Sequence, residues 1–329
     1  MAAGDVTLPG TIGVTMPRPF FSIVVPTWNR GKLIEETIHS LLNQNFPRSQ
    51  YEIIVVDDGS TDDTVNRLEP FLDRIRIFQQ QNSGAASARN RGMQQARGEY
   101  IVCFDHDDIL FPHALTVYKR AIDAFARPPV LMASTGRASE LAPGKPAKLE
   151  CVKCKDFFGK TIPTVVLNSI LILRKDSVLN AGGYSLDIKS YDDHDLLFKL
   201  GNASPMVKII QPITVWYRLH DRNATRNPEF VTEGVLALIR NERLGVYPGG
   251  GRRMLDRRGL IGSNVLQNCC SYYLKARQIS LQARLGHIVR LLLYARGMIL
   301  VAFIRKGFSY FYSQEYRSLD CSISDSAEV

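Results

Sequence analysis

The sequence predicts an α/β fold in which helices flank a central, mostly parallel sheet. Runs of β-branched and other apolar residues at 20–25, 51–56 and 100–104 are typical of buried strands. Segments with apolar residues at helical spacing separate these runs, so strand and helix alternate through about the first 125 residues. That alternation is typical of a doubly wound half-domain. With 329 residues, 45% of them apolar, the chain can bury such a core and a smaller second unit.

Each element of the first half has its own signal. Pro26 is expected to stop the first strand. Apolar residues three and four apart predict a helix over 31–46. After the second strand, Ser60 or Thr61 is placed to cap the next helix. The series continues with a strand at 74–78, a helix at 83–97 and a further helix that begins near Pro112.

The second half is less regular. Prolines between residues 127 and 160 indicate loops. Cys151 and Cys154 have a metal-like spacing, but no second Cys/His pair lies at a zinc-finger distance, so we expect a plain loop there. The sequence then predicts a strand at 169–173, a Gly-Gly-Tyr turn at 182–184, a helix from 193 to 200 and a strand at 209–217. Beyond residue 231 it becomes helical and basic.

The net charge of +9 is concentrated towards the C-terminal end. Thirteen Lys or Arg and two acids lie between residues 240 and 306, a local charge of +11, which leaves −2 for the remainder. We therefore expect a flexible leader (1–18), an α/β domain (19–235) and a basic helical C-terminal extension (236–329). A basic region of this kind suits nucleic acid, anionic lipid or a phosphorylated acceptor.

An apolar stripe at helical spacing runs through this extension, at Leu281, Leu285, Ile288, Leu292 and Ile299. Packing against the α/β domain explains it, and the alternative is peripheral contact with an anionic membrane. No nucleic-acid-binding module accompanies the charge, so nucleic acid is not an expected partner. There is no signal-peptide pattern, and no apolar run reaches the ~18 residues of a spanning helix. We expect a cytoplasmic protein, with the inner face of the membrane as a peripheral site.

Candidate ligand-binding residues directly follow three of the predicted strands. They are Pro26, Thr27 and Trp28 after the strand at 20–25, Asp57 and Asp58 after the strand at 51–56, and Asp105 to Asp108 after the strand at 100–104. Carboxyl ends of parallel strands meet at one edge, where open α/β sheets bind ligands. An aromatic ring beside hydrogen-bonding groups suits a nucleobase and its ribose. The alternative is ordinary turn chemistry around Asp57 and Asp58.

Asp105, Asp107 and Asp108 are the strongest single signal. Carboxylates gathered in one place raise one another's pKa unless a cation joins them. Oxygen ligands suit Mg²⁺ or Mn²⁺, which also binds phosphate oxygens. For Asp108, capping of the helix near Pro112 is the preferred alternative. The glycine-rich dinucleotide fingerprint and the P-loop are both missing, which argues against hydride transfer and P-loop phosphoryl transfer.

Two further clusters carry chemistry. Asp192 and Asp193 precede a helix, where a carboxylate can serve as a general base, although the helix dipole alone favours acids there. Arg218 and His220 follow the strand predicted at 209–217 and offer a cation and an imidazole. A metal or phosphate contact and a purely structural histidine are both open for His220.

Taken in order, these segments resemble the family 2 glycosyltransferases, inverting enzymes with the GT-A fold, a Rossmann-like α/β fold. The matching strings are FSIVVPTWNRGKLIEETIHSLLNQ, YEIIVVDDGSTDDT, QNSGAASARNRGMQQARGEYIVCFDHDD, GGY, YDDHDLLFKL and YRLH. The resemblance covers roughly residues 20–223. The resemblance implies a nucleotide-diphosphate sugar donor, most often a UDP-sugar, and Mn²⁺ or Mg²⁺ as cofactor. It also implies a glycan or lipid-linked acceptor, as in polysaccharide biosynthesis of the cell envelope.

The resemblance also implies roles for single residues. Donor binding falls to Pro26, Thr27, Trp28, Asp57, Asp58, Asn82, Arg89 and Asp105. Metal binding falls to Asp105 and Asp107, with His220 as a further candidate. Asp193 matches the usual general base, but Asp192 and His194 depart from the family pattern and leave Asp192 open as the base. The implied reaction is a single displacement with inversion. A nucleotide-sugar-binding or scaffold protein without turnover is the alternative, and the intact acids argue against it.

Overall fold

The computed structural model describes residues 18–136, 149–154, 170–201, 206–220, 227–248 and 280–295. Its strands are β1 (Phe21–Thr27), β2 (Tyr51–Asp57), β3 (Arg76–Gln79), β4 (Tyr100–Cys103), β5 (Ile109–Leu110), β6 (Val130–Met132), β7 (Thr135–Gly136), β8 (Glu150–Cys154), β9 (Leu171–Arg174), β10 (Met206–Gln211) and β11 (Val215–Trp216). Its α-helices are α1 (Gly31–Leu42), α2 (Thr64–Leu68), α3 (Ala85–Gln95), α4 (Ala114–Ala124), α5 (Lys175–Asn180), α6 (Asp192–Lys199), α7 (Pro228–Arg243) and α9 (Leu281–Ala295).

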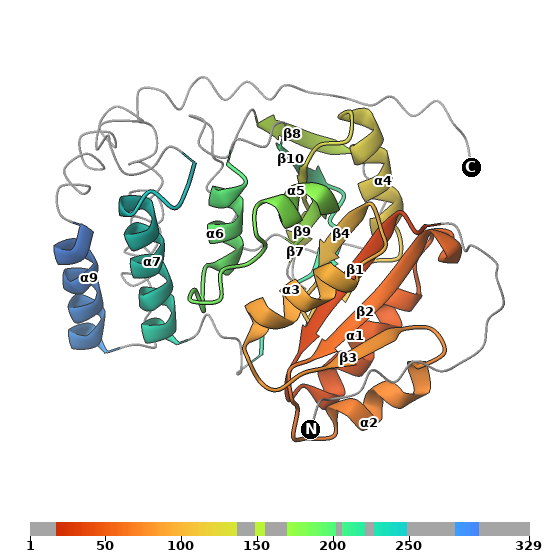
Figure 1. The fold of residues 1–329 in the computed structure, drawn as a ribbon, viewed down its shortest axis with the longest axis horizontal. Helices are drawn as coiled ribbons and strands as arrows, with labels where there is room; N and C mark the ends of the chain where they lie inside the picture. Colours follow the sequence, from red (N-terminus) through yellow and green to blue (C-terminus); the bar gives the residue numbers. More distant parts are fainter. Residues whose placement is uncertain are drawn as a thin grey trace.

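An eight-stranded sheet organises these elements (Figure 1). Its strand order is β3-β2-β1-β4-β9-β6-β10-β8, and only β9 and β8 run against the other strands. A smaller sheet has the order β5-β11-β7. The predicted α/β architecture with a mostly parallel central sheet is therefore confirmed.

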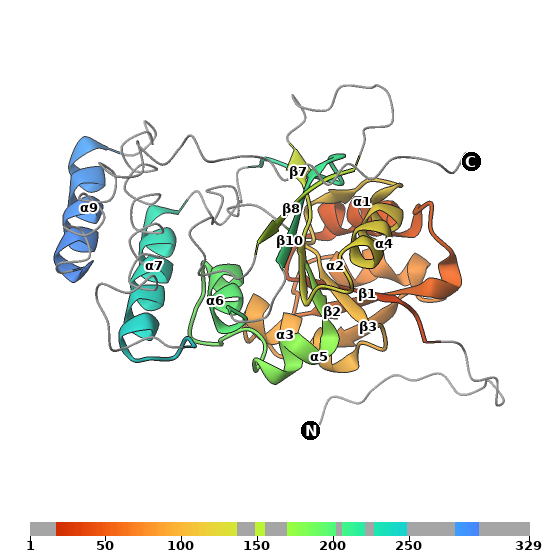
Figure 2. The ribbon, with the colours of Figure 1, turned by 90° about the horizontal axis from the view of Figure 1, so that it is seen from above.

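Helices cover both faces of the large sheet, with α1 and α4 on one side and α3 and α5 on the other (Figure 2). The alternation of side chains along β1 explains this arrangement. Ile23 and Val25 join the apolar core under α1, α2 and α4, whereas Val24 joins the core under α3. Gly92 lets α3 approach closely, because a Cβ there would lie 2.3 Å from Val24 Cγ1. The side that carries α3 is the side on which α6 also packs.

One predicted boundary in the first half is wrong at Pro26, which lies inside β1. Pairing between β1 and β4 ends at Val24, so the missing N–H of Pro26 faces no neighbouring strand. The carbonyl oxygen of Pro26 lies 2.9 Å from His106 Nδ1 instead. Ser60 and Thr61 do not cap the next helix either, because α2 begins at Thr64.

The second half contains more regular structure than expected. β6, β7 and β8 lie within 127–160, where prolines indicated loops. Cys151 is buried in β8, which pairs with β10, so the expectation of a plain loop is wrong there. The strand predicted at 209–217 is two strands in different sheets, β10 and β11. Long-range pairing, which no local pattern reveals, forms these short strands.

Helix α7 lies between α6 and α9 (Figures 1 and 2). Val235, Leu238 and Ile239 of α7 pack into the same core as α6. Of the predicted apolar stripe, Ile288 packs on this core, whereas Leu281 and Leu285 are exposed. The side chain of Leu292 and the whole of Ile299 lie outside the described residues. No helix in the described ranges has the length and apolar character needed to span a bilayer.

Candidate active site

Three loops meet at the carboxyl end of the parallel strands. Asn29, after β1, accepts a hydrogen bond from Thr61 N at 2.8 Å, and its own N–H donates to Ser60 Oγ at 2.9 Å. His106, after β4, contacts the carbonyl of Pro26. These bonds connect the loops after β1, β2 and β4 into one continuous edge. The acids that follow the three strands therefore lie on a shared structure.

The residues at the end of β1 combine a buried hydroxyl with an exposed ring. Thr27 is buried, and its Oγ1 has no hydrogen-bond partner among the described residues. Leaving such a group unpaired costs about 1–3 kcal/mol, so a polar ligand group would be stabilised beside it. Trp28 is 48% exposed, which leaves its ring accessible for stacking rather than packed in the core.

The two acids at the end of β2 are both buried, but they have different surroundings. The Asp57 carboxylate accepts the backbone N–H three residues further on, at 3.2 Å. The Asp58 carboxylate accepts three hydrogen bonds of 2.8 Å, from Gln80 Nε2 and from the backbone N–H groups of Ser83 and Gly84. Because Gly84 immediately precedes α3, Asp58 anchors the start of that helix. Asp57 closes only its own turn.

An acidic cluster lies after β4. Oxygen atoms of Asp105, Asp107 and Asp108 all lie within 4.8 Å of one another. Burial is the main cause that raises the pKa of Asp108 to about 8, and the negative charges of Asp105 and Asp107 add to it. Burial also acts to raise the pKa of Asp107, but His106 and His220 outweigh it and hold the pKa of that carboxyl below its usual range. His220 Nε2 lies 2.9 Å from Asp107 Oδ2.

Arg218, which follows β11, also contacts this cluster. Its backbone N–H donates to Asp108 Oδ1 at 3.1 Å, and its Nε donates to the carbonyl of Asp107. Its guanidinium also pairs with Glu36 on α1. The helix after the cluster begins at Ala114, so the expectation that Asp108 caps it is wrong. The Asp108 carboxylate instead accepts a hydrogen bond from the backbone N–H of Arg218, which lies 110 residues further along the chain.

The side chains of this cluster fit the predicted divalent cation. Three carboxylates beside an imidazole form an oxygen-rich donor set of the kind that Mg²⁺ and Mn²⁺ accept. Burial, followed by the negative charges of Asp105 and Asp107, raises the pKa of Asp108, and a bound cation would offset the repulsion among the three carboxylates. Asp105, Asp107 and Asp108 could each supply one oxygen, with His220 as a nitrogen ligand or as a partner that orients Asp107.

The acid pair predicted as the base begins α6. Burial is the main cause that raises the pKa of Asp193 to about 7, and the negative charge of Asp192 is the second. Tyr184 donates its hydroxyl hydrogen to Asp193 Oδ1 at 2.7 Å. Burial also raises the pKa of Asp192, while Arg89 opposes that shift. A carboxyl with a pKa near neutrality can exchange a proton at physiological pH, which is what a general base requires.

Arg89 on α3 joins the acidic cluster to α6. Its guanidinium donates to Asp105 Oδ1 at 2.7 Å and to Asp192 Oδ2 at 2.6 Å. Burial acts to lower the pKa of this guanidinium, but the two carboxylates raise it well above its ordinary value. Asp105, Arg89 and Asp192 therefore form one charged bridge. Asn82, by contrast, is exposed in the loop before α3.

The structure adds residues to the site that sequence reasoning missed. Tyr184 contacts Asp193, and Gln80 contacts Asp58. The Gly-Gly-Tyr turn was visible in the sequence and marked the place of Tyr184. Its partner was not visible, because the contact depends on how the turn and α6 pack.

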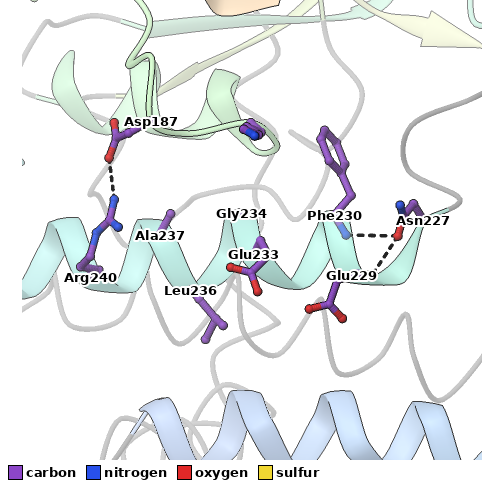
Figure 3. Close-up of a pocket in the computed structure, with 10 residues that line it drawn as sticks. Asp187, Asn227, Glu229, Phe230, Glu233, Gly234, Leu236, Ala237 and Arg240 are labelled. Atoms are coloured by element: carbon purple, nitrogen blue, oxygen red, sulfur yellow. Dashed lines mark hydrogen bonds and ion pairs between the residues drawn. The ribbon is translucent and has the colours of Figure 1, made fainter. Parts of the chain in front are cut away.

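A separate cavity of about 620 Å³ lies between α7 and residues 187–189 (Figure 3). In this view Arg240 of α7 reaches Asp187, and the Asn227 side chain accepts backbone N–H groups at the start of the helix. The residues that line the cavity are Asp187, Lys189, Asn227, Glu229, Phe230, Glu233, Gly234, Leu236, Ala237 and Arg240. None of the predicted site residues lines it, so it is distinct from the acidic cluster.

Comparisons with known proteins identify a family, similar sequences and a similar fold. Residues 22–150 match the family model "Glycosyl transferase family 2". Among curated relatives, the chain is 36% identical over 94 residues to the poly(ribitol-phosphate) beta-N-acetylglucosaminyltransferase TarS of Staphylococcus aureus, which covers 27% of this chain and 16% of TarS. It is 42% identical over 114 residues to the GalNAc(5)-diNAcBac-PP-undecaprenol beta-1,3-glucosyltransferase of Campylobacter jejuni, which covers 33% of this chain and 36% of that protein.

The matched segment thus spans little more than a third of these relatives' own length at most. The likeness in three dimensions extends further. A crystal structure of Staphylococcus aureus TarS 1-349 in complex with UDP superimposes with a TM-score of 0.63 at 22% identity, covering 90% of this chain and 93% of that one. At this identity the superposition establishes a common fold.

Proposed function

The chain belongs to glycosyl transferase family 2 through residues 22–150 and has the GT-A fold, and from this premise we propose that it transfers a sugar from a nucleotide-diphosphate sugar to an acceptor hydroxyl. The proposed donor is a UDP-sugar, and the proposed outcome is inversion at the anomeric carbon. The TarS structure that shares this fold was solved with UDP bound, which favours a uridine nucleotide here as well.

The observation that carries this proposal is the bridge through Arg89. It places the acidic cluster after β4 and the acid pair at the start of α6 within reach of one side chain. An inverting transfer requires a site for the diphosphate and a base for the acceptor close together. These two groups of carboxylates supply those roles in adjacent positions.

In this proposal the nucleotide lies against the ends of β1 and β2. The Trp28 ring stacks on the base, the Thr27 hydroxyl gains its missing partner, and Asp57 accepts a hydrogen bond from the base or ribose. Asp58 contributes indirectly, because its three hydrogen bonds fix the start of α3 and hence Arg89. Asn82 lies in the exposed loop before α3, and we propose that it contacts the edge of the nucleotide-sugar.

The acidic cluster would hold Mn²⁺ or Mg²⁺ through Asp105 and Asp107, with Asp108 and His220 beside them. A bound divalent cation would neutralise charge on the departing diphosphate. Asp193 takes the proton from the acceptor hydroxyl as the acceptor oxygen attacks the anomeric carbon. Asp192 is engaged by Arg89, which leaves Asp193 as the freer base of the pair.

The proposed acceptor is a glycan or a lipid-linked saccharide. The Campylobacter relative is named for an undecaprenyl-diphosphate-linked substrate, which favours an acceptor held at a membrane. Exposed Leu281, Leu285 and Val289 on α9 lie four residues apart and would contact the membrane surface from the cytoplasmic side. A role in cell-envelope polysaccharide synthesis would follow from this acceptor.

The experiment that tests the proposal is Asp193→Asn, assayed for UDP release from UDP-N-acetylglucosamine and UDP-glucose with Mn²⁺. Removing a general base is expected to slow turnover about 100-fold or more. Binding of UDP and Mn²⁺, measured by calorimetry, should stay close to that of the wild type. Asp187→Asn is the matched control, since Asp187 pairs with Arg240 away from the site. Undiminished turnover by Asp193→Asn would refute the assigned base, and no turnover by the wild type would favour a binding protein.

A further inference from the structure

Tyr184 is built into the site although its side chain is not among the acids and bases discussed so far. It is only 2% exposed, and its hydroxyl lies 2.7 Å from Asp193 Oδ1. The guanidinium of Arg89 lies over its ring, 5.2 Å from the centroid. The same tyrosine therefore contacts both the predicted base and the arginine that bridges the two acidic groups.

The backbone of Tyr184 is held as firmly as its side chain. Asn90, next to Arg89 on α3, receives the Tyr184 N–H at 2.8 Å and donates to the Tyr184 carbonyl at 2.8 Å. Gly183 has φ +65, and a Cβ at that residue would lie 2.4 Å from Asn90 Oδ1. Only glycine permits both the left-handed backbone and this close approach. The turn thus presents the Tyr184 hydroxyl at a position that α3 determines.

Resting on the proposed function, we propose that Tyr184 is the positioning residue of the general base. It holds Oδ1 of Asp193, so that Oδ2 is presented to the acceptor hydroxyl. Among the described residues no hydrogen bond engages Oδ2, which leaves that oxygen for the incoming proton. A carboxylate with one oxygen fixed loses rotational freedom before the acceptor arrives, which favours the reactive geometry.

Tyr184 acts as a donor and not as a second base. Burial, and next the charge of Asp193, raises the pKa of its phenol well above the ordinary value, so the hydroxyl keeps its proton. Five groups face Asp193: Asp192 on the same helix, Cys103 at the end of β4, Asp105 after β4, Arg89 on α3 and Tyr184 itself. Burial raises the pKa of the Cys103 thiol to about 12, so it stays neutral. Burial and the two acids raise the pKa of Asp193, whereas Arg89 and the hydrogen bond from Tyr184 lower it. Loss of the hydroxyl must therefore make the base harder to ionise.

Tyr184→Phe tests this, because it removes the hydroxyl and keeps the ring under Arg89. We expect the acidic limb of the kcat–pH profile for UDP release to move up by about one pH unit, since a hydrogen bond to a charged group has roughly that effect. At pH 7 kcat should fall about five-fold or more, while the KM for the UDP-sugar stays within about two-fold. Tyr118→Phe is the matched control: Tyr118 is equally buried, and its hydroxyl contacts Thr214 Oγ1 at 3.0 Å instead.

A kcat–pH profile for Tyr184→Phe that coincides with that of the wild type overturns the inference. So does an equal fall in Tyr118→Phe, which would indicate a general effect of a lost buried hydroxyl. Asn90→Ala provides a second variant if Tyr184→Phe melts below the assay temperature, and it should shift the limb in the same direction. Asp193→Asn assayed in parallel separates the two proposals. If Asp193→Asn is inactive and Tyr184→Phe is normal, only the positioning role fails, whereas an active Asp193→Asn removes the base assignment itself.

Discussion

Arg89 on α3 donates to Asp192 on α6 at a distance of 2.6 Å, although 103 residues separate them in the chain. The other arm of the guanidinium donates to Asp105 at 2.7 Å. A planar fork that engages two carboxylates at once is a property of arginine that lysine lacks. This contact sets the distance between the proposed metal site and the proposed base.

Arg89→Lys should therefore slow turnover, even though the substitution keeps the positive charge. A single ammonium cannot engage both carboxylates, so kcat for UDP release should fall at least about ten-fold. Stability should fall by about 1–3 kcal/mol, because one buried carboxylate loses its charged donor. Urea denaturation measures the second quantity. Arg127→Lys is the control: Arg127 pairs with Glu99 at the surface, and its replacement should change stability by less than about 0.5 kcal/mol.

Chelation by EDTA is expected to abolish UDP release, and added Mn²⁺ or Mg²⁺ should restore it. His220→Ala should raise the Mn²⁺ concentration for half-maximal rate about 10–100-fold, whether His220 binds the ion or orients Asp107. His39→Ala, at an exposed site on α1, should leave the metal requirement as it is. Full activity in EDTA would contradict the metal assignment.

The rate should depend on pH with a limb on the acidic side. Burial, and next Asp192, raises the pKa of Asp193 to about 7, and only the ionised carboxylate can accept the acceptor proton. Below pH 7 the rate should therefore fall about ten-fold per pH unit. Asp192→Asn removes the neighbouring negative charge, which lowers the pKa of Asp193 and should shift the limb to lower pH. A limb that stays in place in Asp192→Asn would contradict this electrostatic origin.

The buried carboxylate of Asp195 should make a large contribution to stability. It is fully buried on α6 and accepts hydrogen bonds from Tyr247 at 2.7 Å and from Ser185 at 2.6 Å. Tyr247→Phe leaves this charge with one donor fewer and should lower the free energy of unfolding by about 1.5–3 kcal/mol. Tyr118→Phe removes a bond between two neutral hydroxyls and should cost only about 1 kcal/mol. Equal losses in the two variants would contradict a charge-assisted bond at Asp195.

Local patterns were sufficient for the elements with long apolar periodicity. The runs at 51–56 and 100–104 and the helix at 83–97 correspond to β2, β4 and α3, with shifts of one or two residues at their ends. Such elements are specified by their own side chains, because buried strands and amphipathic helices need a fixed spacing of apolar residues. The short strands β6, β7 and β8 have no such spacing, and partners far along the chain form them.

The candidate site also has features that the sequence predicts and features that depend on tertiary contacts. That acids follow β2 and β4 was readable, because the sequence places Asp57 and Asp105 directly after apolar runs. That Asp108 would join the acidic cluster instead of capping a helix was not readable, because its hydrogen-bond donor is the backbone N–H of Arg218, which follows β11. In the same way, nothing local to Tyr184 indicates that its hydroxyl contacts Asp193.

The amino-acid order by itself determined the α/β class, the family and the chemical character of the active edge, because these depend on residue types at short spacing. The tertiary structure alone decided which charged groups neutralise one another and which carboxyl has a pKa near 7. Those properties arise from burial and from distances of a few ångströms between residues a hundred positions apart, and neither is encoded in any single segment.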